Sequence, residues 1–407
     1  MVQQKVKYTD TERTPAERAR ALLEEMTLDE KMAQLGCIFP FGDSYDDMEQ
    51  QALEMPYGIG QVSTLEMRRI GTLEEAAGWQ RKMQETVMRQ SPHHIPAIFH
   101  MEGLCGAFIQ EGTSFPSGIA RGSGWDPELE EKIAKVVAKQ EAACGITHIL
   151  APVLDISRDS RMGRQGETYG EDPALAAALG AAYTKGIQTT EAGGRRPESV
   201  AKHFLGFHNS QGGIHGTNSD TPSRLMEEIY GKPFQSAISE SELKGVMPCY
   251  NSIDGEPASV SHRLLTELLR EKMGFDGLCV SDYGGINNAH EVQRIGETIG
   301  ETGLLAMEAG MDIEMPKATG YGEELKEMFR SGQADTELLD RTVLRVLEAK
   351  FRMGLFEHPF AMDGESCQKI FEEKEGAELS FRSARESMVL LKNNGILPLS
   401  GDRKSVV

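Results

Sequence analysis

Short apolar runs without polar alternation recur along the chain, and each predicts a buried β-strand. They lie at residues 58–64, 95–101, 146–156, 199–206, 245–251, 277–282 and 309–315. In the run 277–282, Leu278, Cys279 and Val280 follow one another, a pattern typical of a strand covered on both faces of a parallel sheet. The pattern predicts these seven strands and leaves the position of an eighth unclear.

Helical segments lie between these runs and have clear start signals. Asp126 and Asp172 are each followed by a proline, so that the aspartate can cap a helix and the proline can occupy its first position. Ser261 can cap a third helix. Alternation of strands and helices predicts right-handed βαβ units around a parallel sheet. Seven or eight such units favour an α/β fold of the (β/α)8 TIM-like barrel type over an open sheet.

The alternating pattern stops after residues 356–360. We therefore expect the barrel to occupy residues 1–357. The charged stretch 358–375 is typical of a linker. Residues 376–407 start a helix, a proline-containing turn and the first residues of a strand, which predicts the beginning of an incomplete second α/β domain.

Composition and charge narrow the classes of partner. The chain has 407 residues, 39% hydrophobic and 26% charged, as in an ordinary globular protein. A formal net charge of −20 repels phosphate backbones and anionic lipid headgroups, so we expect no binding to nucleic acid or to membranes. The polar start of the chain lacks a signal-peptide core, which favours a cytoplasmic protein.

Six cysteines are scattered along the chain without a CxxC pair or regular spacing. Several lie in apolar runs, where a free thiol behaves as a small hydrophobic group. We expect reduced core cysteines and no disulfide framework.

Polar residues gather where the predicted strands end. Because the carboxyl ends of barrel strands share one face, we expect these side chains to converge on one mouth. The candidates are Glu102, Arg164, Lys202, His203, Tyr250 and Asp282.

This set of side chains suits a neutral ligand that is rich in hydroxyl groups. Glu102 can accept hydrogen bonds from hydroxyls, while Arg164, Lys202 and His203 can donate them. The same cations would keep Asp282 ionised, as a carboxylate nucleophile must be. Attack by a carboxylate on an acetal carbon is the retaining glycosidase mechanism, which also needs a second carboxyl group about 5–5.5 Å away. No candidate supplies that second group.

Lys202 and His203 present a geometric problem, because adjacent residues of a regular strand point to opposite faces. Both can face one ligand only if the backbone departs from strand geometry. The sequence therefore predicts a cis or otherwise irregular peptide at this point.

Six motifs together resemble the N-terminal domain of glycoside hydrolase family 3, the β-glucosidase and β-xylosidase family. They read KHFLGFHNSQGG, MGRQGETYGEDP, MPCYNSIDGEP, LLTELLREKMGFDGLCVSDYGGI, AGMDIEMP and ESMVLLKNNGILPL. The resemblance covers nearly the whole chain. It implies a (β/α)8-like barrel followed by a linker and an α/β sandwich domain.

The resemblance also implies roles for the candidate residues. The aspartate of the family's Ser-Asp-aromatic motif is its nucleophile, and that position is Asp282 here. Sugar-binding roles follow for Glu102, Arg164, Lys202, His203 and Tyr250, each matched at its own motif. The implied activity is that of a retaining, exo-acting β-glucosidase or β-xylosidase. Its substrates would be β-linked oligosaccharides or aryl and alkyl β-glycosides.

The chain departs from the family pattern in two places. Family members often carry a histidine where this chain has Cys105. The family's acid/base glutamate usually lies in the second domain, so the protein's own C-terminal domain is an expected partner. A subset that cleaves N-acetylglucosaminides instead uses a histidine–aspartate pair after the KHF motif, for which His215 and Asp220 are the candidates, although their pattern differs.

Two other readings remain open from the residues. One is a metal-dependent barrel hydrolase, with ligands drawn from His100, Glu102, His203, His208 and Asp282. Because Lys202 and Arg164 would compete with a cation and no spacing matches a familiar ligand pattern, we expect no metal and no other cofactor. The other is a sugar-binding or scaffolding protein without turnover. The sequence leaves the sugar, the linkage and the oligomeric state open.

Overall fold

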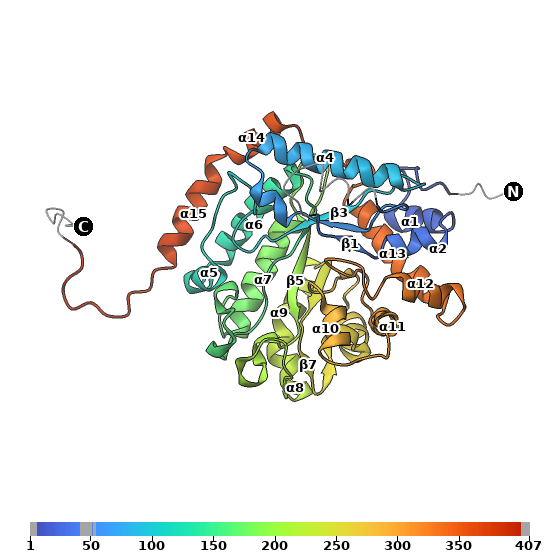
Figure 1. Ribbon diagram of the computed structural model, residues 1–407. Coiled ribbons are helices and arrows are strands. Elements are labelled where there is room, and N and C mark those ends of the chain that lie inside the picture. Colours follow the sequence, from blue (N-terminus) through green and yellow to red (C-terminus); the bar gives the residue numbers. More distant parts are fainter. Residues whose placement is uncertain (1–5, 41–50, 52–53, 400–407) are drawn as a thin grey trace.

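The computed structural model describes residues 6–40, 51 and 54–399. Seven short parallel strands form one curved sheet at its centre, in the order β1-β2-β3-β4-β5-β6-β9 (Figure 1). The strands are β1 (Cys37–Ile38), β2 (Gln61–Ser63), β3 (Ile98–Met101), β4 (His148–Ile149), β5 (Glu198–Phe204), β6 (Gly245–Pro248) and β9 (Leu278–Cys279). Five of them lie within predicted runs, β5 begins one residue before its run, and β1 was not predicted.

The seventh predicted run, 309–315, completes the ring of strands. Ile313 forms a parallel bridge with Val280, directly after β9. On its other side, the backbone nitrogen of Glu314 donates to the carbonyl of Leu35, just before β1, at 3.0 Å. Backbone hydrogen bonds therefore run from β9 through this segment to the start of β1. The fold is the TIM-like α/β barrel that the sequence predicts.

Helices surround the sheet (Figure 1). The longer ones are α4 (Leu73–Gln90), α6 (Pro127–Ala143), α7 (Pro173–Gln188), α9 (Lys232–Ser241), α11 (Ile299–Ala309) and α13 (Thr336–Arg352). The shorter ones are α1 (Pro15–Leu23), α2 (Leu28–Ala33), α5 (Gly118–Gly124), α8 (Ser223–Leu225), α10 (Gly285–Glu291) and α12 (Glu323–Arg330). A small antiparallel hairpin, β7 (Ser252–Ile253) with β8 (Glu256–Pro257), follows β6.

The predicted helix starts are confirmed by their capping hydrogen bonds. The Asp126 side chain accepts from the backbone nitrogen of Leu129 at 3.0 Å, and Asp172 caps α7 in the same way. Ser261 accepts from the backbone nitrogen of Leu264 at 3.2 Å. The segment that follows, Arg263–Lys272, is wound as a π-helix and not as the expected α-helix.

The core lies on both faces of the sheet. Every residue of β3 and β5 is buried, as expected for strands covered on two sides. Helix α7 packs closely on this layer, because a Cβ atom at Gly180 would come within 2.3 Å of the Leu154 side chain. This packing fixes the strands and so positions the residues at their ends.

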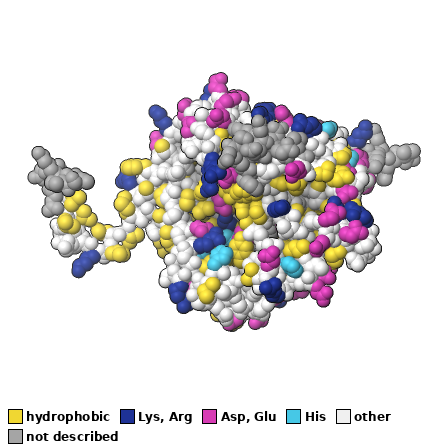
Figure 2. All heavy atoms as spheres, in the orientation of Figure 1, with side chains coloured by type: hydrophobic (Ala, Val, Ile, Leu, Met, Phe, Trp, Pro, Cys, Tyr) yellow, Lys and Arg dark blue, Asp and Glu magenta, His cyan; other side chains and the backbone are white. Residues whose placement is uncertain are grey.

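Two further helices follow the barrel, α14 (Gly364–Phe371) and α15 (Lys374–Glu386). Helix α14 falls within the predicted linker and packs against α4 and α6, with Cys367 and Phe371 buried. After α15 an extended segment leaves the body and exposes apolar side chains, among them Leu391 at 91% (Figure 2). The predicted domain division stays a prediction, and its last residues, 400–407, lie outside the described part of the chain.

The described helices were compared with the requirements for crossing a membrane. Within residues 6–40, 51 and 54–399, none of the helices combines the length and the apolar character that a bilayer span requires.

Candidate active site

The predicted site residues lie at the carboxyl ends of the strands. Glu102 directly follows β3, and Lys202 is in the last half of β5. The two side chains meet: Lys202 Nζ donates to Glu102 Oε1 at 2.8 Å and to Oε2 at 2.6 Å. The Lys202 side chain is 3% exposed and that of Glu102 is 24% exposed, so the pair lies at the boundary between the packed barrel and its mouth.

The backbone between Lys202 and His203 is irregular, as the sequence predicts. The peptide bond that joins them is cis, and the pairing of β5 with β6 shifts register between Lys202 and Phe204. His203 lies on the same side as Lys202, with its Nε2 atom 3.7 Å from Asp282 Oδ2. The structure thus brings both residues to the mouth of the barrel.

His203 is held by a buried carboxylate that the sequence analysis missed. Asp155 Oδ2 lies 2.7 Å from His203 Nδ1, and both Asp155 oxygens accept from the backbone nitrogen of His203 at 3.3 Å. Burial raises the pKa of Asp155 to about 6. Burial also lowers the pKa of His203 well below its ordinary value, so the ring is neutral near pH 7.

The hydrogen bonds of His203 fix its tautomer. Arg164 Nη2 lies 3.2 Å from His203 Nε2. Because a guanidinium can only donate, Nε2 must be the accepting nitrogen and Nδ1 carries the proton that is donated to Asp155. The ring therefore presents an unprotonated nitrogen toward Arg164 and Asp282.

Arg164 is held in place by Glu167, three residues later in the same loop. Two parallel hydrogen bonds join them, from Nε to Oε1 and from Nη2 to Oε2, each 2.8 Å long. The guanidinium also lies over the Phe207 ring, 5.1 Å from its centroid. Burial opposes the Arg164 charge, but Glu167, Asp155 and Asp282 outweigh it and raise the pKa of Arg164. This cation stays charged at any working pH.

Asp282 has one occupied and one free oxygen. Its Oδ1 accepts from the backbone nitrogen of Tyr283 at 2.7 Å. Its Oδ2 is buried and accepts no hydrogen bond from the described residues. The cap position of the following helix α10 is taken by Gly284, so the Asp282 side chain is not a helix cap. The free oxygen faces the side of the mouth that carries His203 and Arg164.

Tyr250 completes the predicted set. Its hydroxyl donates to the carbonyl of Tyr283 at 2.7 Å. Burial raises the pKa of Tyr250, and the negative charge of Asp282 adds to the rise, so the phenol stays protonated. All six predicted residues therefore lie in one connected region, and Asp155, Glu167 and Phe207 join them.

The residues of the N-acetylglucosaminidase alternative do not pair. The His215 ring lies against Tyr250 and Phe207, with centroid distances of 5.0 and 5.2 Å. Asp220 instead accepts hydrogen bonds from Gln211 and Asn218. Among the contacts of the described residues, none joins His215 to Asp220.

The side chains named for the metal-hydrolase alternative are not arranged as metal ligands in the described structure. Within the described ranges, no group of three or more His, Cys, Asp or Glu side chains is arranged to hold a metal ion. Of the five proposed ligands, Glu102 is paired with Lys202 and His203 with Asp155. Cys105, which replaces a histidine of the family motif, interacts with Arg121, and burial raises the pKa of its thiol.

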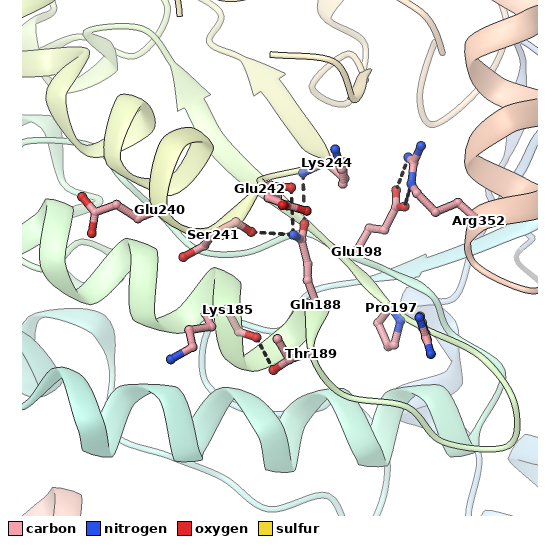
Figure 3. Close-up of a pocket in the computed structure, with 11 residues that line it drawn as sticks. Lys185, Gln188, Thr189, Pro197, Glu198, Glu240, Ser241, Glu242, Lys244 and Arg352 are labelled. Carbon is pink, nitrogen blue, oxygen red and sulfur yellow. Dashed lines mark hydrogen bonds and ion pairs between the residues drawn. The ribbon is translucent and has the colours of Figure 1, made fainter. Parts of the chain in front are cut away.

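A separate hollow of about 490 Å³ lies at the amino ends of β5 and β6 (Figure 3). Glu198, the first residue of β5, accepts there from Arg352 Nε at 2.6 Å. Lys244, just before β6, is paired with Asp276 at 2.7 Å. This hollow contains none of the predicted site residues, and it opens at the opposite end of β5 from His203.

Comparison with known proteins identifies the family of this chain. The model of the glycosyl hydrolase family 3 N terminal domain matches residues 27–349. The chain belongs to glycoside hydrolase family 3. A β-xylosidase from Formosa agariphila is 33% identical over 322 residues, which are 75% of this chain and 44% of that protein. A β-glucosidase from Rhizobium radiobacter is 34% identical over 291 residues, 71% of this chain and 33% of that protein.

Solved structures of family members share the fold. A β-glucosidase from Erythrobacter marinus matches with a TM-score of 0.90 and 32% identity, over 97% of this chain and 52% of that one. The β-glucosidase from Listeria innocua in complex with glucose matches with a TM-score of 0.83 and 30% identity, over 95% and 53% of the two chains. The family 3 chain described here thus spans about half the length of these two relatives.

Proposed function

We propose that this chain is the nucleophile-bearing domain of a retaining, exo-acting β-glycosidase, a β-glucosidase or β-xylosidase. The observation that carries the proposal is the free Oδ2 of Asp282, which faces a neutral histidine and a permanently charged arginine. Both activities occur among the named relatives. The Listeria innocua relative was solved in complex with glucose, which supports a monosaccharide as a ligand of this chain.

In the proposed reaction, Asp282 Oδ2 bonds to the anomeric carbon while the bond from that carbon to the leaving oxygen breaks. Arg164 stabilises the carboxylate before attack, and neutral His203 and the Lys202–Glu102 pair bind the sugar hydroxyls. Tyr250, kept protonated, positions the segment that carries Asp282 through its bond to Tyr283. Water then displaces the aspartate from the sugar and restores the original anomeric configuration.

We place the acid/base group in a downstream domain. Three carboxyls at the described part of the mouth are already engaged: Glu102 accepts from Lys202, Glu167 from Arg164 and Asp155 from His203. None of these three is left free to protonate a leaving group. Because such protonation contributes about 10²–10⁴-fold, the chain by itself should act slowly, and best on aryl glycosides whose leaving group needs no proton.

Azide rescue tests the nucleophile. Asp282→Gly should abolish hydrolysis of an activated aryl β-glycoside, and added azide should restore turnover with an α-glycosyl azide as product. The matched control is Asp276→Gly, which removes an exposed aspartate at the opposite end of the barrel and should leave turnover unchanged. Unimpaired hydrolysis by Asp282→Gly, or a β-configured azide, would refute the assignment.

A further inference from the structure

One buried histidine of the barrel wall has no part in the proposed reaction. His100 lies in β3 and is 0% exposed. Its register partner on β2 is Ser63, which is also buried. Because paired residues of neighbouring strands point to the same face of a sheet, these two side chains lie next to each other.

Both side chains reach the same hydroxyl group. The hydroxyl oxygen of Tyr283 lies 2.8 Å from Ser63 Oγ and 2.8 Å from His100 Nε2. A tyrosine hydroxyl can donate one hydrogen bond and accept another, so it bonds to both groups in either tautomer of His100. Burial raises the pKa of Tyr283 well above its ordinary value, and the hydroxyl therefore keeps its proton. The other ring nitrogen of His100, Nδ1, has no hydrogen-bond partner among the described residues.

The ring of Tyr283 is held from its sides as well. Its centroid lies 6.0 Å from that of Phe39 and 5.9 Å from that of His100, and both contacts are edge-on. Edge-to-face packing and two hydrogen bonds at the hydroxyl together define one orientation of the ring.

Tyr283 directly follows the candidate nucleophile and bonds to it. Its backbone nitrogen donates to Asp282 Oδ1 at 2.7 Å, and its carbonyl accepts from the Tyr250 hydroxyl at 2.7 Å. The N–H that holds Asp282 and the ring that His100 holds belong to one residue. The direction of this N–H, and with it the direction of the carboxylate, therefore depends on how the ring is fixed.

We propose that His100 is a positioning residue for the nucleophile. With Ser63 it fixes the hydroxyl of Tyr283, and Tyr283 in turn holds Asp282 Oδ1 so that Oδ2 faces the sugar. This role rests on the proposed function, because it concerns the step in which Asp282 bonds to the anomeric carbon. His100 is completely buried and acts through Tyr283.

The proposal predicts a loss of rate without a loss of affinity. When the His100 bond is removed, Tyr283 can turn, and the carboxylate that its N–H holds turns with it. Misplacing a reacting group by about 1 Å can slow the chemical step about 10²-fold. The side chains assigned to the sugar hydroxyls, Lys202, Glu102 and His203, keep their own partners, so binding of the sugar should persist.

Covalent labelling of the intact protein with an activated 2-deoxy-2-fluoro-β-glycoside, the glucoside or the xyloside, measures this step as a limiting rate constant and an apparent Kd. His100→Asn shortens the side chain so that it cannot reach Tyr283. It should lower the rate constant about ten- to hundredfold and change the Kd by less than about twofold. Burial lowers the pKa of His100 to about 3, so the ring is neutral and an uncharged amide can replace it. His100→Gln, which reaches further and can donate or accept, should restore most of the rate.

A combined variant tests whether His100 acts through Tyr283. Tyr283→Phe removes the hydroxyl and should show the same loss of rate. In that background His100→Asn should have no further effect, because both changes remove one and the same bond. Additive losses would contradict the proposed connection. If His100→Asn does not fold, Tyr283→Phe alone tests whether the rate constant falls at an unchanged Kd.

His148→Asn is the matched control. His148 is the register partner of His100 on β4, is equally buried and lies 3.1 Å from Gln61 Nε2 through its Nδ1 atom. This variant should label at the rate of the wild type. An unchanged rate constant in His100→Asn, an equal loss in His148→Asn, or a loss confined to the Kd overturns the positioning role. A wild type that acquires no label on Asp282 overturns the proposed function itself, and the role of His100 with it.

Discussion

Replacing Asp155 by asparagine should weaken sugar binding although Asp155 itself faces His203 and not the ligand. The carboxylate accepts from His203 Nδ1 at 2.7 Å and from the His203 backbone nitrogen at 3.3 Å. Asparagine has the same shape but no charge, and its NH₂ group cannot accept from either donor. A hydrogen bond to a charged group contributes about 1.5–3 kcal/mol. About 1.4 kcal/mol corresponds to a tenfold change in an equilibrium constant. We therefore expect the affinity for the sugar to fall about ten- to hundredfold.

The assay is the Kd of a monosaccharide by calorimetry at pH 7.5, together with kcat/KM on an activated aryl glycoside. Asp155 has a pKa of about 6 and is ionised at this pH. As the pH falls through 6 its protonation removes the charged acceptor, so kcat/KM of the wild type should fall there. Asp155→Asn should lack this limb of the pH profile, which a merely structural defect would not change.

The matched control is Asp159→Asn in the same loop. Asp159 pairs with the exposed Arg161 at 2.6 Å and touches none of the site residues. It should leave both Kd and the pH profile unchanged. If Asp155→Asn binds sugar within about twofold of the wild type, or keeps the acidic limb near pH 6, Asp155 does not orient His203 in the way argued here.

Two further predictions concern buried lysines. Lys202→Met removes the cation that faces Glu102. It should lower the free energy of unfolding by about 2 kcal/mol and abolish monosaccharide binding. An unchanged free energy of unfolding in denaturant would contradict a stabilising role of the Lys202–Glu102 pair. Burial lowers the pKa of Lys350 from 10.5 to about 7, so between these pH values the unfolded state binds more protons and stability rises with pH. Lys350→Met should remove up to about 1.4 kcal/mol per pH unit of this rise, whereas the exposed Lys369→Met should not.

Most of the barrel could be predicted because its strands are covered on both faces and therefore consist of continuous apolar runs. The strand β1 escaped notice because it has only two residues, Cys37 and Ile38, which is too short a run to show a strand pattern. The segment around Ile313 was predicted correctly, although the structure gives it a single bridge and a few backbone hydrogen bonds in place of a regular strand.

The candidate site was predictable to the extent that each residue follows a strand. Asp155 could have been found by the same rule, since it ends the apolar run 146–156 as Asp282 ends its own run. Glu167 and Phe207 could not, because neither directly follows a strand and their contacts with Arg164 appear only in the folded chain. The tautomer of His203 also depends on three-dimensional partners that no spacing in the sequence reveals.

The claim on which this account rests is that Asp282 forms a covalent bond with the sugar. Incubation of the chain with an activated 2-deoxy-2-fluoro-β-glycoside, followed by digestion and mass spectrometry, tests it directly. The account predicts one fluoroglycosyl label, on the peptide that contains Asp282. A label on any other carboxylate would contradict it.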